Sequence, residues 1–85
     1  MEKSLFSKNY EVLLRQLREA RLEAGLTQDA VASKLQQTQS FVSKCERGER
    51  RIDLVELREF CRALGIPFTK FVKQLDETLE ANSER

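Results

Sequence analysis

Three polar side chains occupy one side of a short helix that the sequence predicts near the middle of the chain. Gln39, Ser40 and Lys44 take its first, second and sixth positions and point away from Val42 and Cys45, which are spaced to face a core. A glutamine amide can bond an adenine at two points, a lysine can donate to guanine, and a serine can serve several base edges. The chemistry open to this face is hydrogen bonding to the edges of bases.

The groups that catalysis needs are missing from the sequence. It has no histidine, and its two cysteines, Cys45 and Cys61, lack the spacing of a zinc site or of a CxxC redox motif. There is no glycine-rich phosphate loop and no convincing pair of carboxylates. We therefore expect no enzyme activity, no cofactor, no metal and no small-molecule substrate. Both thiols are expected to be free and to pack as small apolar side chains.

Length and charge limit the organisation of the chain. Eighty-five residues predict one domain, 1–85, with one modest core. No apolar run is long enough for a signal sequence or a membrane span, which predicts a cytoplasmic protein with no membrane partner. The net charge is +1, but residues 1–51 carry ten Lys and Arg against seven Asp and Glu, while residues 52–85 carry five against seven. This asymmetry predicts that the first half faces phosphates.

Five helices are predicted to position the polar face, and they make the fold an all-α, compact five-helix bundle. Apolar residues recur at helical spacing, and helix caps and glycines mark the ends, over about 9–24, 27–35, 38–47, 53–64 and 67–79. Thr27, Thr38 and Asp53 are predicted caps, and Glu56 can complete a capping box with Asp53. Pro67 suits the first turn of the last helix. The second and third helices, about 27–47, form a helix-turn-helix.

A family resemblance rests on three short motifs in this half of the chain. They are Gly25-Leu26-Thr27-Gln28 at the start of the second helix, Gln39-Ser40-Phe41-Val42-Ser43 at the start of the third, and Glu46-Arg47-Gly48-Glu49-Arg50-Arg51 at its end, with Ala32 at the helix crossing. With these motifs, the run from Leu17 to Leu75 resembles the Cro and phage-repressor (XRE) type of bacterial regulator. The ending Ala63-Leu64-Gly65-Ile66-Pro67 and the helix after it look most like the controller proteins of restriction-modification systems.

The resemblance implies a lambda-repressor-like domain that regulates transcription. Such a protein binds double-stranded DNA in a sequence-specific manner, as a homodimer on a palindromic operator, and is nucleoid-associated when bound. An antitoxin or a helical adaptor that keeps this fold to bind a protein is the alternative. One departure lies in the turn, where Gln36 takes a left-handed position that members of the family usually fill with glycine.

Site residues follow from the resemblance, position by position. Base contacts are implied for Gln39, Ser40, Lys44 and Phe41, whose ring could instead pack on a neighbouring helix. Phosphate contacts are implied for Gln28, Ser43, Arg50 and Arg51, and the alternative for the two arginines is a solvated loop.

Two further sets of residues are expected to hold the protein together. Related proteins imply an ion pair between Arg21 and Glu46, which would fix the recognition helix against the first helix. The last helix offers more apolar surface than a small core needs, which predicts a dimer interface. Its apolar residues are Phe68, Phe71, Val72, Leu75 and Leu79. The alternative is that all of them pack inward.

Overall fold

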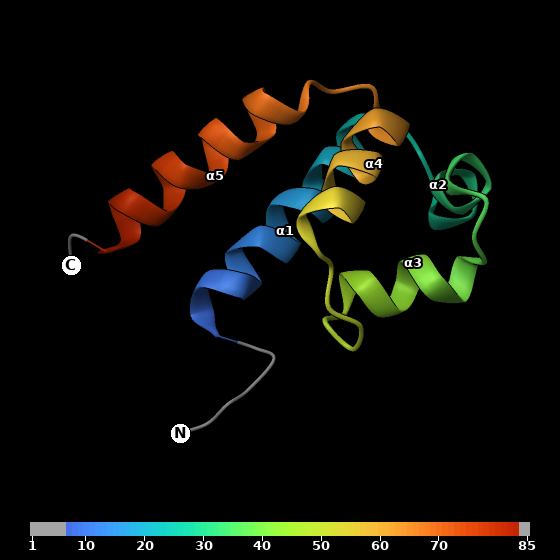
Figure 1. Ribbon diagram of the computed structural model, residues 1–85, viewed down its shortest axis with the longest axis horizontal. Helices are drawn as coiled ribbons and strands as arrows, with labels where there is room; N and C mark the ends of the chain where they lie inside the picture. The colour runs from blue at the N-terminus through green and yellow to red at the C-terminus, as the bar shows by residue number, and fades with distance from the viewer. Residues whose placement is uncertain (1–6, 84–85) are drawn as a thin grey trace.

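Five helices make up the structure, a computed structural model that describes residues 7–83 (Figure 1). They are α1 (Lys8–Glu23), α2 (Gln28–Leu35), α3 (Gln39–Glu46), α4 (Leu54–Leu64) and α5 (Phe68–Ser83). The predicted all-α bundle of five helices is confirmed. The ends of the expected domain, residues 1–6 and 84–85, lie outside the described residues.

Short polar side chains begin the helices as the sequence predicts. The hydroxyls of Thr27 and Thr38 accept hydrogen bonds from backbone N–H groups three residues ahead. The carboxylate of Asp53 accepts from the Glu56 N–H at 2.7 Å, and the Glu56 carboxylate accepts from the Asp53 N–H at 3.0 Å, which completes the capping box. These caps satisfy N–H groups that have no partner within the helix.

The last helix differs from its predicted bounds at both ends. α5 begins at Phe68, so Pro67 lies just before the helix instead of inside its first turn. The Pro67 carbonyl accepts from the N–H of Phe71 at 3.1 Å, which is the first hydrogen bond of the helix. α5 also runs to Ser83, four residues beyond the predicted end at Leu79. Helix ends are the least reliable part of a prediction from sequence.

The turn between α2 and α3 contains a left-handed residue that is not glycine. Gln36 has φ 58° and ψ 41° and ends α2. Among the described residues it is the sole non-glycine residue with positive φ. An L-residue in this region costs roughly 1 kcal/mol relative to glycine, because Cβ approaches the backbone. The departure noted in the sequence is therefore absorbed as local strain, and α3 forms normally after it.

A single hydrophobic core holds the helices together. Its most completely buried side chains are Leu17 of α1, Val31 of α2, Val42 and Cys45 of α3, and Cys61 of α4. Phe71 is the one buried residue of α5. The Tyr10 hydroxyl accepts a hydrogen bond from the buried N–H of Ile52 at 3.0 Å, so the loop before α4 is attached to α1.

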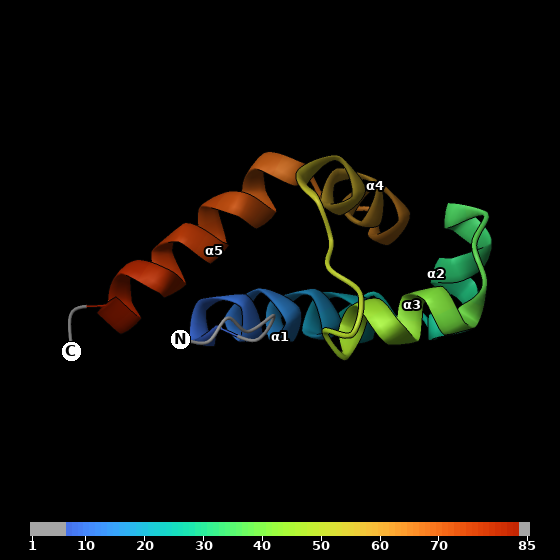
Figure 2. The ribbon, with the colours of Figure 1, turned by 60° about the horizontal axis from the view of Figure 1, so that its bottom comes forward.

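The predicted DNA-reading surface on α3 and the predicted dimer surface on α5 lie far apart in this fold. In both ribbon views α3 and α5 lie toward opposite ends of the molecule, with α1 and α4 between them (Figures 1 and 2). A ligand on the exposed face of α3 would therefore leave α5 accessible.

Candidate nucleic-acid interface

α3 presents its polar face to solvent. Val42 and Cys45 are completely buried, while Gln39, Ser40 and Lys44 are exposed. This division follows from the 3.6-residue period of the helix, which separates positions 42 and 45 from positions 40 and 44. The three side chains that could bond base edges are available for a ligand.

Beneath α3, Arg21 and Glu46 form a buried ion pair. The Arg21 Nε donates to Glu46 Oε2 at 2.6 Å, and its Nη2 donates to Glu46 Oε1 at 3.1 Å. The remaining Nη1 donates to the Leu26 carbonyl at 3.0 Å, in the loop between α1 and α2. The side chain of Glu46 is only 4% exposed. This two-point contact joins the end of α3 to α1 and to the loop before α2.

The ion pair continues into two glutamines that reach the exposed face. The amide nitrogen of Gln28, at the start of α2, donates to Glu46 Oε1 at 3.0 Å. The amide nitrogen of Gln39 in turn donates to Gln28 Oε1 at 2.7 Å. The structure thus brings together Arg21, Glu46, Gln28 and Gln39, which the sequence assigned to three separate roles.

The ring of Phe41 lies against α4. It is half-buried and stacks on Phe60, with ring centroids 6.4 Å apart and an interplanar angle of 11°. The Arg50 guanidinium lies 4.8 Å from the centroid of the Phe41 ring. Of the two roles left open for Phe41, this is the packing role.

Arg50 and Arg51, the two predicted phosphate ligands after α3, both make contacts within the protein. Arg50 forms two hydrogen bonds with the Glu56 carboxylate, at 3.1 and 2.9 Å. Arg51 lies over the ring of Tyr10, 4.5 Å from its centroid. No pattern in the sequence paired Arg50 with Glu56, although Glu56 was expected in the capping box.

A neighbouring arginine that the sequence analysis did not assign also lies here. Arg47 donates to the Ser43 hydroxyl at 2.8 Å and to both carboxylate oxygens of Glu49, at 3.0 and 3.2 Å. Ser43, a predicted phosphate ligand, is therefore an acceptor for Arg47 in this structure. A basic residue directly after the recognition helix, at its C-cap, was the signal that could have identified Arg47.

These contacts alter the acidity of two carboxyl groups and two thiols. Hydrogen bonds from Arg47 lower the pKa of Glu49, and hydrogen bonds from Arg50, then from the Asp53 N–H, lower the pKa of Glu56. Burial raises the pKa of the Cys61 thiol to about 11. Burial also raises the pKa of Cys45, against a smaller opposite effect of Arg50. Near neutral pH both carboxylates are charged and both free thiols are neutral.

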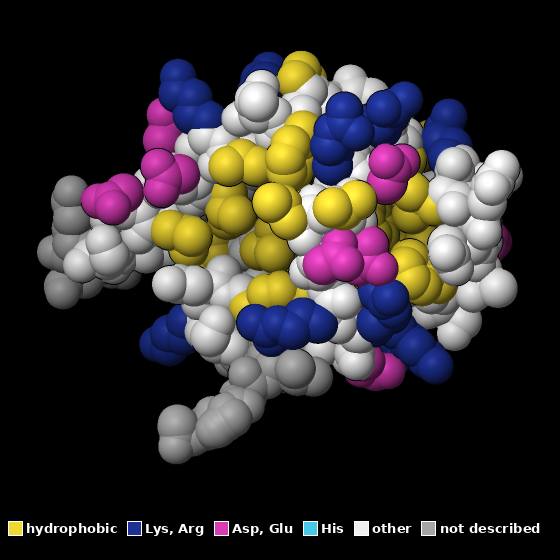
Figure 3. Space-filling view, in the orientation of Figure 1, with side chains coloured by type: hydrophobic (Ala, Val, Ile, Leu, Met, Phe, Trp, Pro, Cys, Tyr) yellow, Lys and Arg dark blue, Asp and Glu magenta, His cyan; other side chains and the backbone are white. Residues whose placement is uncertain are grey.

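Apolar side chains gather on the face formed by α4 and α5 (Figure 3). Val72 is 37% exposed, and the other predicted interface residues, Phe68, Leu75 and Leu79, are half-buried. Phe71 differs from them because it packs in the core. The two most exposed large apolar residues, Leu54 and Val55, lie in the first turn of α4. Neither residue was predicted to be part of an interface, although both fall outside the apolar stripe of that helix.

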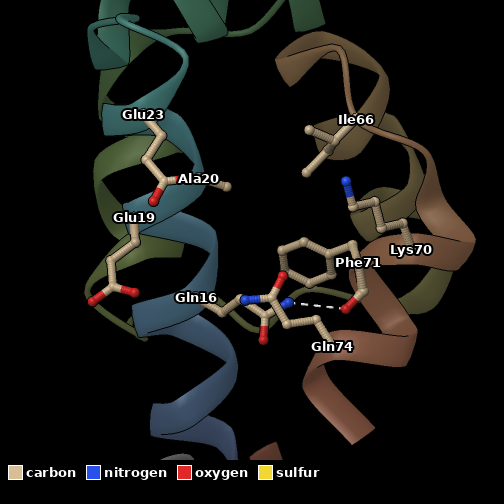
Figure 4. A pocket seen from close by; sticks show the side chains of 8 residues that line it. All are labelled: Gln16, Glu19, Ala20, Glu23, Ile66, Lys70, Phe71 and Gln74. Atoms are coloured by element: carbon tan, nitrogen blue, oxygen red, sulfur yellow. Dashed lines mark hydrogen bonds between the residues drawn. The ribbon is translucent and has the colours of Figure 1, made fainter. Parts of the chain in front are cut away.

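A shallow pocket of about 170 Å³ lies between α1 and α5, and Figure 4 shows the side chains that line it. At its base the buried amide of Gln16 donates to the carbonyl of Phe71 at 2.9 Å. Glu19 and Glu23 line the α1 side, and Lys70 lines the α5 side. Within residues 7–83 no group of His, Cys, Asp or Glu side chains could hold a metal ion, and no helix there could cross a membrane.

Comparisons with known proteins agree with this geometry. Residues 12–71 match the family described as helix-turn-helix domain. An uncharacterized HTH-type transcriptional regulator, y4dJ of Sinorhizobium fredii, is 38% identical over 58 residues, which cover 68% of this chain and 75% of that protein.

Solved structures of helix-turn-helix proteins are also similar to this chain. An XRE-family like protein from Pseudomonas syringae is 43% identical, with a TM-score of 0.79 over 82% of this chain and 85% of the other. The restriction-modification controller protein C.Esp1396I, solved as a tetramer with its natural 35-base-pair operator, is 24% identical. It shares the fold with a TM-score of 0.76, over 85% of this chain and 95% of its own. The chain therefore belongs to the XRE-type helix-turn-helix family of DNA-binding transcriptional regulators.

Proposed function

We propose that the protein is a homodimeric, sequence-specific transcriptional regulator, in which α3 of each protomer reads one half of a palindromic operator. The observation that carries this proposal is the exposed face of Gln39, Ser40 and Lys44 on a helix whose other side is fully buried. A helix presented in this way fits the major groove, where each base pair shows a distinct pattern of donors and acceptors. The chain would act as one unit in the cytoplasm, without a catalytic role.

Phosphate contacts would come from residues around the base-reading face. Gln28 lies at the start of α2, where unpaired backbone N–H groups and the helix dipole favour an anion. Ser43 lies within α3, and Arg50 and Arg51 follow its other end. The side chains of Arg50 and Glu56 are 44% and 30% exposed, and exposed ion pairs contribute little to stability. A DNA phosphate can therefore replace the Glu56 carboxylate at small cost.

The dimer interface would combine α5 with the first turn of α4. Val72, Leu54 and Val55 expose apolar surface that a second copy of the chain would cover. The charges along α5 favour a two-fold arrangement, because Lys70 and Lys73 precede the three acidic residues Asp76, Glu77 and Glu80. A two-fold axis across α5 sets the basic half of one helix against the acidic half of its partner.

Selection of bound sequences from a random pool of DNA duplexes tests the proposal. The expected product is a palindrome whose half-sites are centred about 10–10.5 base pairs, or a multiple of that, apart. Sedimentation of the selected complex should then show two protein chains per duplex. If no sequence is enriched at low salt, the regulator proposal fails, and the fold serves a protein partner as an antitoxin or adaptor does.

A further inference from the structure

The hydrogen bonds that link Glu46 to Gln39 can run in one direction only. A carboxylate accepts hydrogen bonds and cannot donate them. Glu46 Oε2 accepts from Arg21, and Oε1 accepts from Arg21 and from Gln28. Gln28 must therefore turn its NH₂ group toward Glu46, which leaves its oxygen facing Gln39.

The orientation of Gln28 decides which groups Gln39 has left for a ligand. The Gln28 oxygen accepts one N–H of Gln39 at 2.7 Å. The exposed Gln39 amide then keeps one N–H and a carbonyl oxygen with no hydrogen bond to Gln28. An acceptor beside a donor is the pattern that matches adenine, which offers the N6 amino group and the N7 acceptor. It does not match guanine, which offers two acceptors, O6 and N7.

We propose that Glu46 is a positioning residue for base recognition, which selects adenine over guanine at one operator position by setting the direction of the Glu46–Gln28–Gln39 hydrogen bonds. This inference rests on the proposed function, in which α3 enters the major groove. Glu46 itself is almost fully buried and would not touch the DNA. Glu46 would act on base recognition by orienting the side-chain amide of Gln28, which in turn orients that of Gln39.

The substitution Glu46→Gln removes the fixed direction. Glutamine has one acceptor oxygen, whereas Arg21 Nε, Arg21 Nη2 and the Gln28 amide all donate to residue 46. With its oxygen toward Gln28 the new side chain keeps the parent direction, and with its oxygen toward Arg21 Nε it turns its NH₂ group toward Gln28, whose amide then turns its oxygen toward it. In the second orientation Gln28 presents NH₂ to Gln39, and Gln39 accepts with its oxygen, so that both of its N–H groups point outward. Two donors side by side match guanine.

The experiment measures the affinity of purified protein for operator duplexes that carry each of the four bases at each position. The position read by Gln39 is the one where Gln39→Ala relaxes the preference. There the parent protein is expected to prefer adenine over guanine by about 5- to 150-fold, the range of a good two-point base contact. Glu46→Gln is expected to lower this ratio severalfold, toward one, with preferences elsewhere unchanged. An unchanged ratio overturns the inference.

Arg21→Lys is the matched control because it weakens the ion pair but keeps both a positive charge and the Glu46 carboxylate. It is expected to melt at a lower temperature than the parent while keeping the same adenine preference. If Arg21→Lys shifts the base preference as Glu46→Gln does, loss of stability explains the shift and the inference is wrong.

A second variant covers the case in which Glu46→Gln does not fold. Gln28→Met leaves the ion pair intact and removes the amide that orients Gln39, so the adenine-to-guanine ratio should fall toward one. A retained ratio overturns the inference. If the parent protein prefers a base other than adenine at this position, the inference fails and the regulator proposal stands. If the parent protein prefers no sequence, the proposed function itself fails.

Discussion

Removal of either partner of the Arg21–Glu46 pair should cost far more stability than removal of both. In Arg21→Met, the Glu46 carboxylate stays buried at 4% exposure and keeps the Gln28 amide as a donor. A buried ion that has lost its partner typically costs 3–5 kcal/mol. Loss of the hydrogen bond from Arg21 to the Leu26 carbonyl adds about 1 kcal/mol.

This loss is large for a domain of this size. At roughly 0.05–0.15 kcal/mol per residue, 85 residues correspond to a total stability of about 4–13 kcal/mol. For domains of this length each kcal/mol lowers the melting temperature by about 4–8 °C. The single variants should therefore melt at least about 12 °C below the parent protein. The double variant Arg21→Met/Glu46→Leu buries no charge, and leaves only the Leu26 carbonyl and the Gln28 amide without their partners. Its cost should be about 1–3 kcal/mol.

A double-mutant cycle tests this prediction. Circular dichroism follows the urea and thermal unfolding of the parent protein, the two single variants and the double variant. The expected result is a double variant more stable than either single variant, with a coupling energy of several kcal/mol. Equal urea m-values would show that the four proteins expose similar surface on unfolding. If the loss in the double variant equals the sum of the single losses, the two side chains do not interact and the reasoning is refuted.

Three further predictions concern the interface, the turn and the core. Val72→Glu together with Leu75→Glu should give a folded monomer with weaker operator binding; a dimer in sedimentation would place the interface elsewhere. Gln36→Gly should raise the free energy of unfolding by about 0.5–1 kcal/mol, since glycine relieves the left-handed strain; an unchanged or lower melting temperature would contradict this. Because burial raises the pKa of the Cys61 thiol to about 11, unfolded chains lose that proton first, and stability should fall as pH rises from about 9 to 11. Cys61→Ala should lack this part of the decline, measured by urea unfolding at each pH.

Helix boundaries and the polar face of α3 could be predicted because the interactions that set them are local. The hydroxyl of Thr38 caps an N–H three residues away, and Gly65 ends α4 through its own backbone conformation. The separation of Lys44 from Cys45 depends only on the period of the helix. Such features need no knowledge of where another helix lies.

The partner of Arg50 could not be predicted because it depends on how α4 packs against α3. Arg50 could reach several carboxylates along the chain, and the fold selects Glu56. The stack of Phe41 on Phe60 likewise needs the relative position of two helices. The exposure of Leu54, in contrast, could have been predicted from the sequence, because this residue lies outside the apolar stripe of its helix.

The buried hydrogen bond from Gln16 to Phe71 has a consequence for the spacing of the operator. The Gln16 amide donates to one carbonyl of α5, and a shift of α5 by half a turn along α1 would move that carbonyl by about 2.7 Å and leave the buried amide without its partner. In the proposed dimer α5 carries part of the interface, so this bond helps to fix the distance and angle between the two reading helices. One inserted base pair rotates a half-site by about 34° and moves it by about 3.4 Å. A protein locked in this way cannot adapt to that change, and it should discriminate sharply between operators that differ only in the length of their centre.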